Sequence, residues 1–374
     1  MDKVKRIDAS GGYGIIDPER EVMVTSPRQN VPRDKVLGVG IVGLGAIAQR
    51  SHIPNFQKAK GARVVAVCDV NEQKAKLVAQ AWGIKHVFTN YEDLLACKEV
   101  DIVSICTPHY LHEPMAIAAC EAKKHVLVEK PFATTLEGGR RMIEAARKNG
   151  VKLGCADFKI FLPVYEVAKD ILESGLIGTP LTFRTKLGHA GPEFWTPVTG
   201  EWFYKAGEAR MGALLDLGMK HISLLRWLLS DEVEWVIGTL RNLWKKGPSV
   251  EVEDYAAAIL RFRSGVTGIL EASWCTIPGF KGTEIVGTQG TIFVDYPNTK
   301  LEVHLGGKVN AVVKPDVPEE SRKGNPFQRF VDCVLDDTTP DVTPEDELRS
   351  LEVVYAIAKS SRLGEAVTLP LKEV

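Results

Sequence analysis

The chain has 374 residues, and its 47 lysines and arginines nearly balance its 48 aspartates and glutamates, for a formal net charge of -1 at pH 7. No basic block interleaved with aromatics could neutralise a run of phosphates, which argues against a nucleic-acid partner. No stretch approaches the roughly 20 uninterrupted apolar residues of a membrane span, and residues 1–20 lack the apolar centre of a secretory signal, so we expect a cytoplasmic protein without a membrane partner.

Residues 1–35 fit neither of the two domains that this length favours. The segment EVMVTSP can form a short strand, but the rest is glycine, proline and charge. We expect either a loose N-terminal extension or an arm that packs on a neighbouring subunit.

Between residues 36 and 156, short apolar runs rich in β-branched residues alternate with helical patterns. The runs are VLGVGIV, ARVVAVC, VDIVSIC, HVLVE and VKLGCA. Strands that are apolar on both faces and separated by helices predict a doubly wound parallel sheet, in the α/β class.

Residues 157–374 follow a different pattern, which predicts an α+β domain with a large, mainly antiparallel open sheet. After helices expected near 164–175 and 213–229, strand-like runs follow one another without helices between them. Two helices are expected to end the chain, at 325–337 and 344–362. The strand-like runs are 234–244, 253–265, 267–275, 280–290, 291–299 and 300–307.

The seven cysteines are scattered along the chain, odd in number, and never form C-x-x-C. Four of them lie inside apolar runs. We interpret them as buried thiols of a reducing compartment, which are neither disulfides nor metal ligands, and we expect no metal.

A glycine motif follows the first apolar strand and begins a helix. Gly43 allows a sharp turn, Gly45 lets backbone approach a pyrophosphate, and Ala48 lets the helix lie close to the strand. Ala46 and Ile47 lie in the same turn, where free backbone N–H groups and the helix dipole favour phosphate. The motif predicts a dinucleotide site.

Asp69 ends the second strand of this domain. A carboxylate at that position accepts hydrogen bonds from the ribose hydroxyls of adenosine and repels a 2′-phosphate. We therefore expect NAD as cofactor rather than NADP, although Asp69 could instead only cap the helix that follows it.

With these residues in view, the chain resembles the glucose-fructose oxidoreductase/inositol dehydrogenase (Gfo/Idh/MocA) family of NAD(P)-dependent sugar and polyol oxidoreductases. The matching motifs are GLGAIA, CDV, CTPHYLH at 106–112, EKP at 129–131, GPEFW, WFY and GALLDLG. The resemblance implies a Rossmann domain and a substrate domain whose open sheet commonly builds homodimers or homotetramers.

The resemblance also implies which residues line the nicotinamide end of the cofactor site. Both CTPHYLH and EKP follow strands at the carboxyl edge of the expected sheet, where ligands bind. There the ammonium of Lys130 can stabilise the negative charge that grows on a substrate oxygen as hydride leaves its carbon. The residues expected at this site are Thr107, Pro108, His109, His112, Glu129 and Lys130.

Residues 216–221 read DLGMKH, where the family carries D-x-G-x-H. The family's aspartate and histidine face the substrate one turn apart, and Asp216 and Lys220 stand in that i, i+4 relation here. His221 is turned about 100° around the helix axis, so it faces elsewhere unless the start of the helix is distorted.

Four interpretations of this catalytic segment remain open. Lys220 is the base if burial and neighbouring cations depress its pKa. Alternatively, Lys220 binds an acidic substrate and the proton leaves through Asp216 or water. In the third interpretation a local shift recruits His221 as the base, and in the fourth the site has lost dehydrogenation.

Substrate contacts are expected from two further segments. The loop at 188–207 carries Trp195, Trp202 and His189, and flat aromatic faces with a few polar groups suit a sugar ring. The alternative is that these aromatics only pack at the cleft between the two domains. Asp157 and Lys159, in ADFKIF, lie near a position where the family often has a polar or basic substrate contact.

The sequence thus favours an NAD-dependent oxidoreductase that acts on a secondary hydroxyl of a sugar, polyol or sugar acid. Two alternatives stay open. One is an enzyme that retains NAD and uses transient oxidation for elimination, epimerisation or glycoside cleavage. The other is a sugar- or nucleotide-binding protein without catalysis.

Overall fold

The computed structural model describes residues 16–17, 22–23, 36–194, 200–276, 281–306 and 310–372, which form two compact units. The first unit contains the described residues up to Ala156 together with Asn325–Glu345. The second contains the described residues of Asp157–Phe194, of Gly200–Gly324 and from Asp346 onward. Residues 325–345, which the sequence-based boundaries assign to the substrate domain, therefore belong to the first unit.

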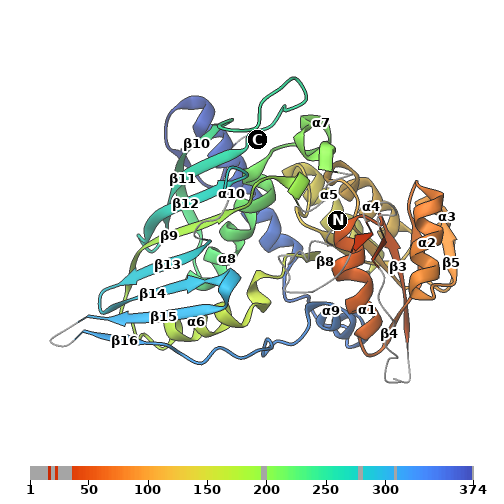
Figure 1. Cartoon of the computed structure of the whole chain (residues 1–374), viewed down its shortest axis with the longest axis horizontal. Coiled ribbons are helices and arrows are strands. Elements are labelled where there is room, and N and C mark those ends of the chain that lie inside the picture. The colour runs from red at the N-terminus through yellow and green to blue at the C-terminus, as the bar shows by residue number, and fades with distance from the viewer. Residues whose placement is uncertain are drawn as a thin grey trace. The chain divides into compact units, whose positions relative to one another are not determined.

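The first unit is built on a six-stranded parallel sheet with the order β5-β4-β3-β6-β7-β8, of which Figure 1 labels β3, β4, β5 and β8. This is the strand order of a Rossmann sheet: successive strands are added on one side of β3 up to β5, and then on its other side from β6. Strands β3, β6 and β8 are buried throughout because helices cover both faces. The strands are β3 (Leu37–Val42), β4 (Ala62–Cys68), β5 (His86–Phe88), β6 (Ile102–Ile105), β7 (His125–Glu129) and β8 (Leu153–Ala156).

The helices of the first unit begin and end at residues suited to those positions. The Asn71 side chain accepts a hydrogen bond from the backbone N–H of Lys74, and Gly83 and Gly150 end α2 and α5 at positive φ. Phe327 of α9 packs edge-on against His52 and Phe56, at ring distances of 4.9 and 5.1 Å. The helices are η1 (Ala48–His52), α1 (Ile53–Lys58), α2 (Glu72–Trp82), α3 (Tyr91–Ala96), η2 (His109–Leu111), α4 (His112–Glu121), α5 (Leu136–Asn149) and α9 (Pro326–Leu335).

Within residues 1–35 the structure describes only β1 (Ile16–Asp17) and β2 (Val22–Met23), which pair antiparallel. The strand expected in EVMVTSP is present at Val22–Met23. The expected arm against a neighbouring subunit otherwise lies outside the described residues.

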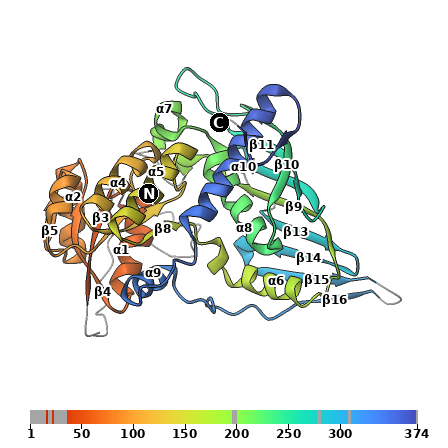
Figure 2. The ribbon, with the colours of Figure 1, turned by 180° about the vertical axis from the view of Figure 1, so that it is seen from behind.

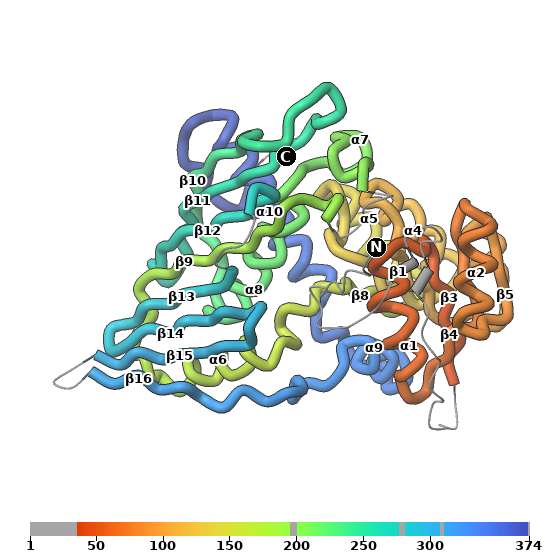
Figure 3. Tube along the Cα trace, viewed as in Figure 1, coloured from red at the N-terminus to blue at the C-terminus, as the bar shows by residue number. Residues whose placement is uncertain are grey.

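The second unit is built on a nine-stranded sheet with the order β16-β15-β14-β13-β9-β12-β11-β10-β17, which can be followed in Figure 3. Only β9 and β12 pair in parallel, so the predicted antiparallel character is confirmed. The strands are β9 (Pro180–Gly188), β10 (Val233–Arg241), β11 (Tyr255–Phe262), β12 (Thr267–Ser273), β13 (Gly282–Gly287), β14 (Gly290–Asp295), β15 (Lys300–Leu305), β16 (Ala311–Val313) and β17 (Val367–Thr368).

The helices of the second unit cover one face of this sheet, as Figure 2 shows for α6, α8 and α10. Phe183, Ala258 and Leu270 point into the core on that side, whereas Ile259 and Ile269 on the opposite face are exposed. The helical segments are η3 (Lys159–Phe161), α6 (Pro163–Glu173), η4 (Pro192–Phe194), η5 (Gly200–Tyr204), α7 (Ala206–Ala209), η6 (Leu214–Gly218), α8 (Met219–Leu229), η7 (Tyr296–Asn298) and α10 (Pro344–Leu363).

Candidate active site

The glycine turn after β3 has the shape that a pyrophosphate requires. Gly43 has a φ of +84°, and a Cβ there would lie 2.8 Å from the backbone carbonyl of Cys106, so no other residue fits without displacement. A Cβ on Gly45 would meet nothing within 4 Å, which leaves open space beside the backbone. Ala46 and Ile47 lead from this turn into η1. Backbone N–H groups at the start of a helix suit the phosphates of a bound dinucleotide.

Asp69 follows β4 and turns its carboxylate toward the glycine turn. Its Oδ2 accepts a hydrogen bond of 2.9 Å from the backbone N–H of Leu44, and its Oδ1 accepts one of 2.9 Å from Asn71. Lys74 lies 3.5 Å away and balances part of the charge. The Asp69 carboxylate is therefore held beside the glycine turn, where the contact with the adenosine ribose is expected.

Replacing Asp69 with alanine is expected to weaken NAD binding by about 10- to 100-fold, because the ribose contact is lost. The difference in affinity between NAD and NADP should also become smaller, because the repulsion of a 2′-phosphate is lost. Isothermal titration calorimetry with each cofactor measures this. Asp101→Ala is the matched control, since Asp101 also accepts a backbone N–H, from Gly38 at 2.8 Å, but next to the amino end of β3. Equal losses in the two variants would contradict the assignment.

Lys130 follows the carboxyl end of β7 and is held through its own backbone. Its N–H donates to Glu129 Oε2 at 3.1 Å, while Glu129 Oε1 lies 2.8 Å from Nε2 of the buried His52. The other ring nitrogen of His52 lies 2.7 Å from the hydroxyl of Ser104 on β6. Three segments of the unit thus fix the start of the EKP turn, which contains a cis peptide bond between Lys130 and Pro131.

Sequence reasoning missed His52 and Ser104. Ser104 lies inside an apolar run that indicates only core packing. His52 lies in the mostly polar segment QRSHIP, where nothing local indicates that its side chain becomes fully buried.

His112 ties two loops of the cofactor edge together. Its Nδ1 lies 2.8 Å from the carbonyl oxygen of Pro131, and its Nε2 lies 2.9 Å from that of Thr107. Burial lowers the pKa of His112, although the two carbonyls oppose this effect. The ring is fully buried and braces the two loops, and its contact with the cofactor stays a prediction.

The remaining residues expected at the nicotinamide end lie between β6 and α4. Pro108 precedes η2, and the buried ring of His109 packs edge-on against His112 at 5.7 Å. The hydroxyl of Thr107 is buried and has no hydrogen-bond partner among the described residues. A buried polar atom of this kind suits a site that a ligand completes.

The segment with Asp216 is wound more widely than an α-helix. Over Leu214–Gly218 it forms a π-helical turn, in which the N–H of Met219 bonds to the carbonyl of Leu214. The predicted i, i+4 relation between Asp216 and Lys220 is therefore not that of a regular helix. Glu253, which sequence reasoning missed, accepts the N–H groups of Gly212 and Leu214 at 2.9 and 3.0 Å and fixes the start of this turn.

Asp216 is 1% exposed and lies between two aromatic groups of the second unit. Trp274 Nε1 donates to its Oδ2 at 3.1 Å, and His189 Nε2 lies 3.6 Å from the same oxygen. Because the N–H of Gly191 donates to His189 Nδ1, the neutral imidazole carries its proton on Nε2, facing Asp216. Trp274 was predicted only as part of a strand.

His221 is buried inside the second unit. Its Nδ1 hydrogen-bonds with the hydroxyl of Thr185 on β9, and its Nε2 has no partner among the described residues. Burial lowers the pKa of His221 well below its ordinary value, and Lys159 and Lys220 add to this effect. The imidazole is therefore neutral at pH 7.

Lys159 lies in η3, which packs against α8. Its Nζ lies 3.6 Å from the centroid of the Tyr296 ring. Burial and the charge of Lys220 lower the pKa of Lys159 to about 7, with Asp157 opposing and Lys281 adding to the effect. Asp157, which is buried, precedes it by two positions.

The aromatic loop forms a cluster within the second unit. The ring of Trp202 stacks on Phe203 at 3.8 Å, and Tyr204 packs edge-on against Trp274 at 5.6 Å while its hydroxyl donates to Glu193. Trp202 is partly exposed, whereas Phe203 is buried. Trp195 lies outside the described residues.

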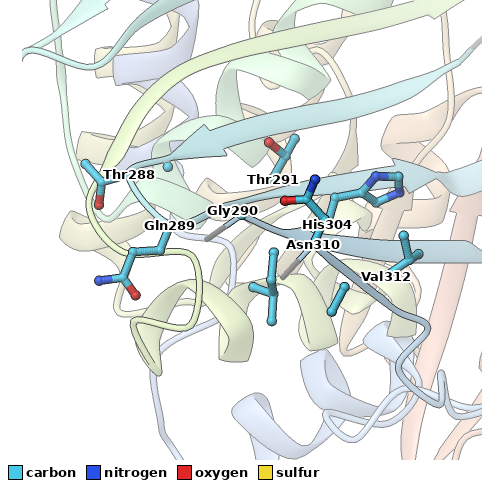
Figure 4. A pocket seen from close by; sticks show the side chains of 11 residues that line it. Thr288, Gln289, Gly290, Thr291, His304, Asn310 and Val312 are labelled. Atoms are coloured by element: carbon cyan, nitrogen blue, oxygen red, sulfur yellow. The ribbon is translucent and has the colours of Figure 1, made fainter. Parts of the chain in front are cut away.

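A separate hollow lies at the turn between β13 and β14 and beside β15 and β16, where Figure 4 shows Thr288, Gln289, Thr291, His304 and Asn310 around it. It contains none of the predicted site residues, and glycines and uncharged side chains form most of its lining. Across the described part of the chain, no three His, Cys, Asp or Glu side chains are grouped as a metal site would need. In the same part, no helix is both long and apolar enough to cross a membrane.

Comparison with known families agrees with this architecture. The Gfo/Idh/MocA model described as an oxidoreductase family with an NAD-binding Rossmann fold matches residues 37–156, and the model of the Gfo/Idh/MocA C-terminal domain matches residues 165–293. The chain therefore belongs to the Gfo/Idh/MocA family, and its first unit is an NAD-binding domain of an oxidoreductase. The predicted family, fold class and cofactor are confirmed.

Individual relatives extend the likeness over most of the chain. The 1,5-anhydro-D-fructose reductase of Ensifer adhaerens is 28% identical over 334 residues, which are 88% of this chain and 98% of that protein. An inositol 2-dehydrogenase/D-chiro-inositol 3-dehydrogenase of Shouchella clausii is 33% identical over 273 residues, or 70% and 73% of the two chains. The crystal structure of an aldose-aldose oxidoreductase from Caulobacter crescentus complexed with glycerol has a TM-score of 0.79 and 27% identity, covering 90% of this chain and 100% of that one.

Proposed function

We propose that this protein is an NAD-dependent dehydrogenase that transfers hydride between the cofactor and a secondary hydroxyl or ketone of a sugar, a polyol or a sugar acid. The observation that carries the proposal is the fixed backbone of Lys130 at the carboxyl end of β7, in a unit whose glycine turn is shaped for a dinucleotide. The relatives named as sugar and inositol oxidoreductases support the substrate class.

In the proposed reaction, NAD held at the glycine turn would supply the acceptor for the hydride of the carbinol carbon. Lys130 donates a hydrogen bond from its ammonium to the substrate oxygen, where negative charge grows in the transition state. Glu129 and His52 hold the chain on which this ammonium is mounted, and His112 braces the two loops beside it. These last three residues position the site without touching the reacting atoms.

The second unit supplies the proposed substrate contacts. His189 presents a polar edge beside Asp216, and the partly exposed face of Trp202 suits the apolar C–H face of a sugar ring. Lys220, at the position of the family's histidine, adds a positive charge on α8. That charge favours an acidic group on the substrate, such as the carboxylate of a sugar acid.

The proposal is tested by incubating the protein with NAD and a panel of sugars, sugar acids and inositols, while absorbance of the reduced cofactor and product mass are followed together. Reduction of NAD matched by a product two hydrogens lighter supports dehydrogenation. Product of changed mass without net reduction would favour the NAD-retaining alternative. NAD binding without any turnover would favour a non-catalytic protein.

The proposal includes a homodimer or homotetramer built on the exposed face of the second sheet. Ile237, Ile259 and Ile269 are cross-strand neighbours on β10, β11 and β12, and they are 37%, 41% and 48% exposed. In an isologous interface the same surface of each subunit meets its counterpart. This exposed row of isoleucines can therefore pack against the same row of a second copy of the chain. A cytoplasmic location is also part of the proposal, and the seven free cysteines support it.

Replacing Ile259 with glutamate is expected to convert the oligomer to a monomer, because it places a charge in the centre of this row. Size-exclusion chromatography with light scattering measures the mass. Leu363→Glu is the matched control, since Leu363 is 50% exposed but lies at the end of α10 and not in this row of the sheet. An unchanged mass for Ile259→Glu would exclude this face as the interface.

A further inference from the structure

A loop of the second unit holds two large apolar side chains at the surface. Residues 242–254 connect β10 to β11 (Figure 1), and within this loop Leu243 is 54% and Trp244 is 44% exposed. Phe194, at the end of η4, is exposed as well. Neighbouring apolar side chains that stay exposed to water mark a surface that binds something.

The backbone under Trp244 is held in place by one buried carboxylate. Asp254 is fully buried, and its Oδ1 accepts a hydrogen bond of 2.8 Å from the N–H of Leu243. Its Oδ2 accepts the N–H of Trp244 at 2.8 Å and that of Lys245. The Trp244 side chain therefore projects from a fixed backbone. A binding surface that is fixed in advance loses less conformational entropy when its ligand binds.

Two charged groups lie beside the exposed rings. Lys245 Nζ lies 3.9 Å from the centroid of the Trp244 ring and 5.6 Å from that of Phe194, and it forms an ion pair with Glu193. Burial opposes the charge of Glu193, but hydrogen bonds from Lys245 and Tyr204 outweigh it and lower the pKa of this carboxyl group. Glu193 is therefore an ionised acceptor at pH 7, and Lys245 is a donor next to it.

A continuous series of contacts joins this surface to Asp216. Trp274 Nε1 donates to Asp216 at 3.1 Å, and the ring of Tyr204 packs edge-on against Trp274 at 5.6 Å. The hydroxyl of Tyr204 donates to Glu193, which pairs with Lys245. All of these residues belong to the second unit. The series runs from the buried carboxylate at the proposed substrate site to the exposed rings.

This combination of groups suits a sugar ring. The C–H faces of a pyranose are apolar and pack on an aromatic ring, while the hydroxyls at its edge bond to nearby donors and acceptors. Lys245 and Glu193 supply one group of each kind. A second copy of the chain fits this surface less well, because it would have to remove the ion pair from water, which costs free energy.

We infer that Glu193, Phe194, Trp244 and Lys245 form a platform for a second sugar ring, so that the substrate is a disaccharide or another glycoside longer than a monosaccharide. The inference rests on the proposed dehydrogenase function, in which the first ring is oxidised beside Asp216. The platform takes no part in hydride transfer. It binds the ground state and the transition state equally, so its contribution appears in KM and leaves kcat unchanged.

The first experiment compares kcat/KM for four disaccharides (maltose, cellobiose, gentiobiose and lactose) with kcat/KM for glucose and galactose. In Trp244→Ala the ratio of the disaccharide value to the monosaccharide value is expected to fall about tenfold, through a higher KM. Trp244→Phe should restore most of the ratio, because it keeps a flat ring. A ratio that stays the same in Trp244→Ala would overturn the platform.

Leu243→Ala is the matched control. Leu243 is exposed in the same loop and is bonded to the same Asp254 carboxylate, but it has no aromatic face. The ratio of the two kcat/KM values should therefore stay unchanged in this variant. An equal fall in Leu243→Ala and Trp244→Ala would show that only the conformation of the loop matters, and would also overturn the platform.

The second experiment needs no turnover. Saturation-transfer NMR is recorded for each disaccharide with NADH bound, because the reduced cofactor cannot oxidise the sugar. Signals from both rings that lose the second-ring part in Trp244→Ala, but keep it in Leu243→Ala, support the inference. No signal from any of the four disaccharides would overturn it. Light scattering of Trp244→Ala is measured alongside, and a lower mass would show that a second copy of the chain covers the rings instead.

The two experiments separate the possible failures. Lys130-dependent turnover of monosaccharides, together with a ratio that Trp244→Ala does not change, would overturn the platform and leave the dehydrogenase in place. Second-ring signals that depend on Trp244, without reduction of NAD by any sugar, would overturn the proposed function while the platform remains.

Discussion

Replacing Lys130 with methionine is expected to lower kcat by about 10³-fold and to leave NAD affinity within about twofold of its original value. The reason is that the proposed partner of the ammonium is an oxygen whose negative charge exists mainly in the transition state. The backbone N–H of Lys130 donates a hydrogen bond of 3.1 Å to Glu129 Oε2, and this bond remains in the variant. The methionine side chain also has a volume similar to that of lysine, so the EKP turn should keep its conformation. Single-turnover kinetics and calorimetry measure the two quantities separately.

Lys85→Met is the matched control for this variant. Lys85 belongs to the same unit, but its ammonium forms an exposed ion pair with Glu99 at 2.6 Å, and such pairs contribute little to stability. Its kcat should stay unchanged. A fall in kcat of less than about tenfold for Lys130→Met would remove Lys130 from the chemistry.

Replacing Gly45 with valine is expected to weaken NAD binding by at least about 100-fold without lowering the melting temperature noticeably. A Cβ at this position meets no atom within 4 Å, and the backbone does not adopt a positive φ there. The new side chain therefore enters only the open space beside the turn, where we expect the pyrophosphate to lie. Calorimetry with NAD and thermal unfolding of the free protein measure the two effects.

Two other glycines supply the comparison. Gly207→Val should change neither NAD binding nor turnover, because Gly207 has equally open surroundings but lies in α7 of the second unit. Gly43→Ala should lower stability by about 1–3 kcal/mol, because its φ of +84° and the nearby Cys106 carbonyl strain any side chain. Tight NAD binding by Gly45→Val would show that the cofactor does not pass over this turn.

The strands of both sheets could be predicted where hydrophobic pattern and burial agree. The strands β3, β4, β6, β7 and β8 are buried between helices, and their sequences are therefore runs of apolar residues that can be recognised without the structure. β9 gave no such signal. Its Arg184 and Lys186 pair with Glu284 on β13 and Glu271 on β12, and these cross-strand pairs are invisible to local periodicity.

The site was predictable where function depends on local backbone shape. Gly43, Gly45 and Asp69 belong to one turn and the strand beside it, so their spacing predicts their arrangement. Trp274, which follows β12, and Glu253, which precedes β11, reach the Asp216 segment from distant parts of the sequence. The charge state of Lys159 depends on Lys220 and Lys281, and nothing in the residues around Lys159 indicates that the fold brings these cations near it.

The wide turn at Leu214–Gly218 has a consequence for how this region can change. Each hydrogen bond of this turn encloses one more residue than in an α-helix, so the turn holds one residue more than a regular helical turn would. The helix α8 that follows has ordinary α-helical geometry. Deleting one residue from the turn would give it ordinary α-helical geometry and would rotate the Asp216 side chain relative to α8. Because Leu214, Leu215 and Leu217 of this turn are buried, a change of length here would also repack the core, so the direction of the Asp216 carboxylate is tied to the packing around it.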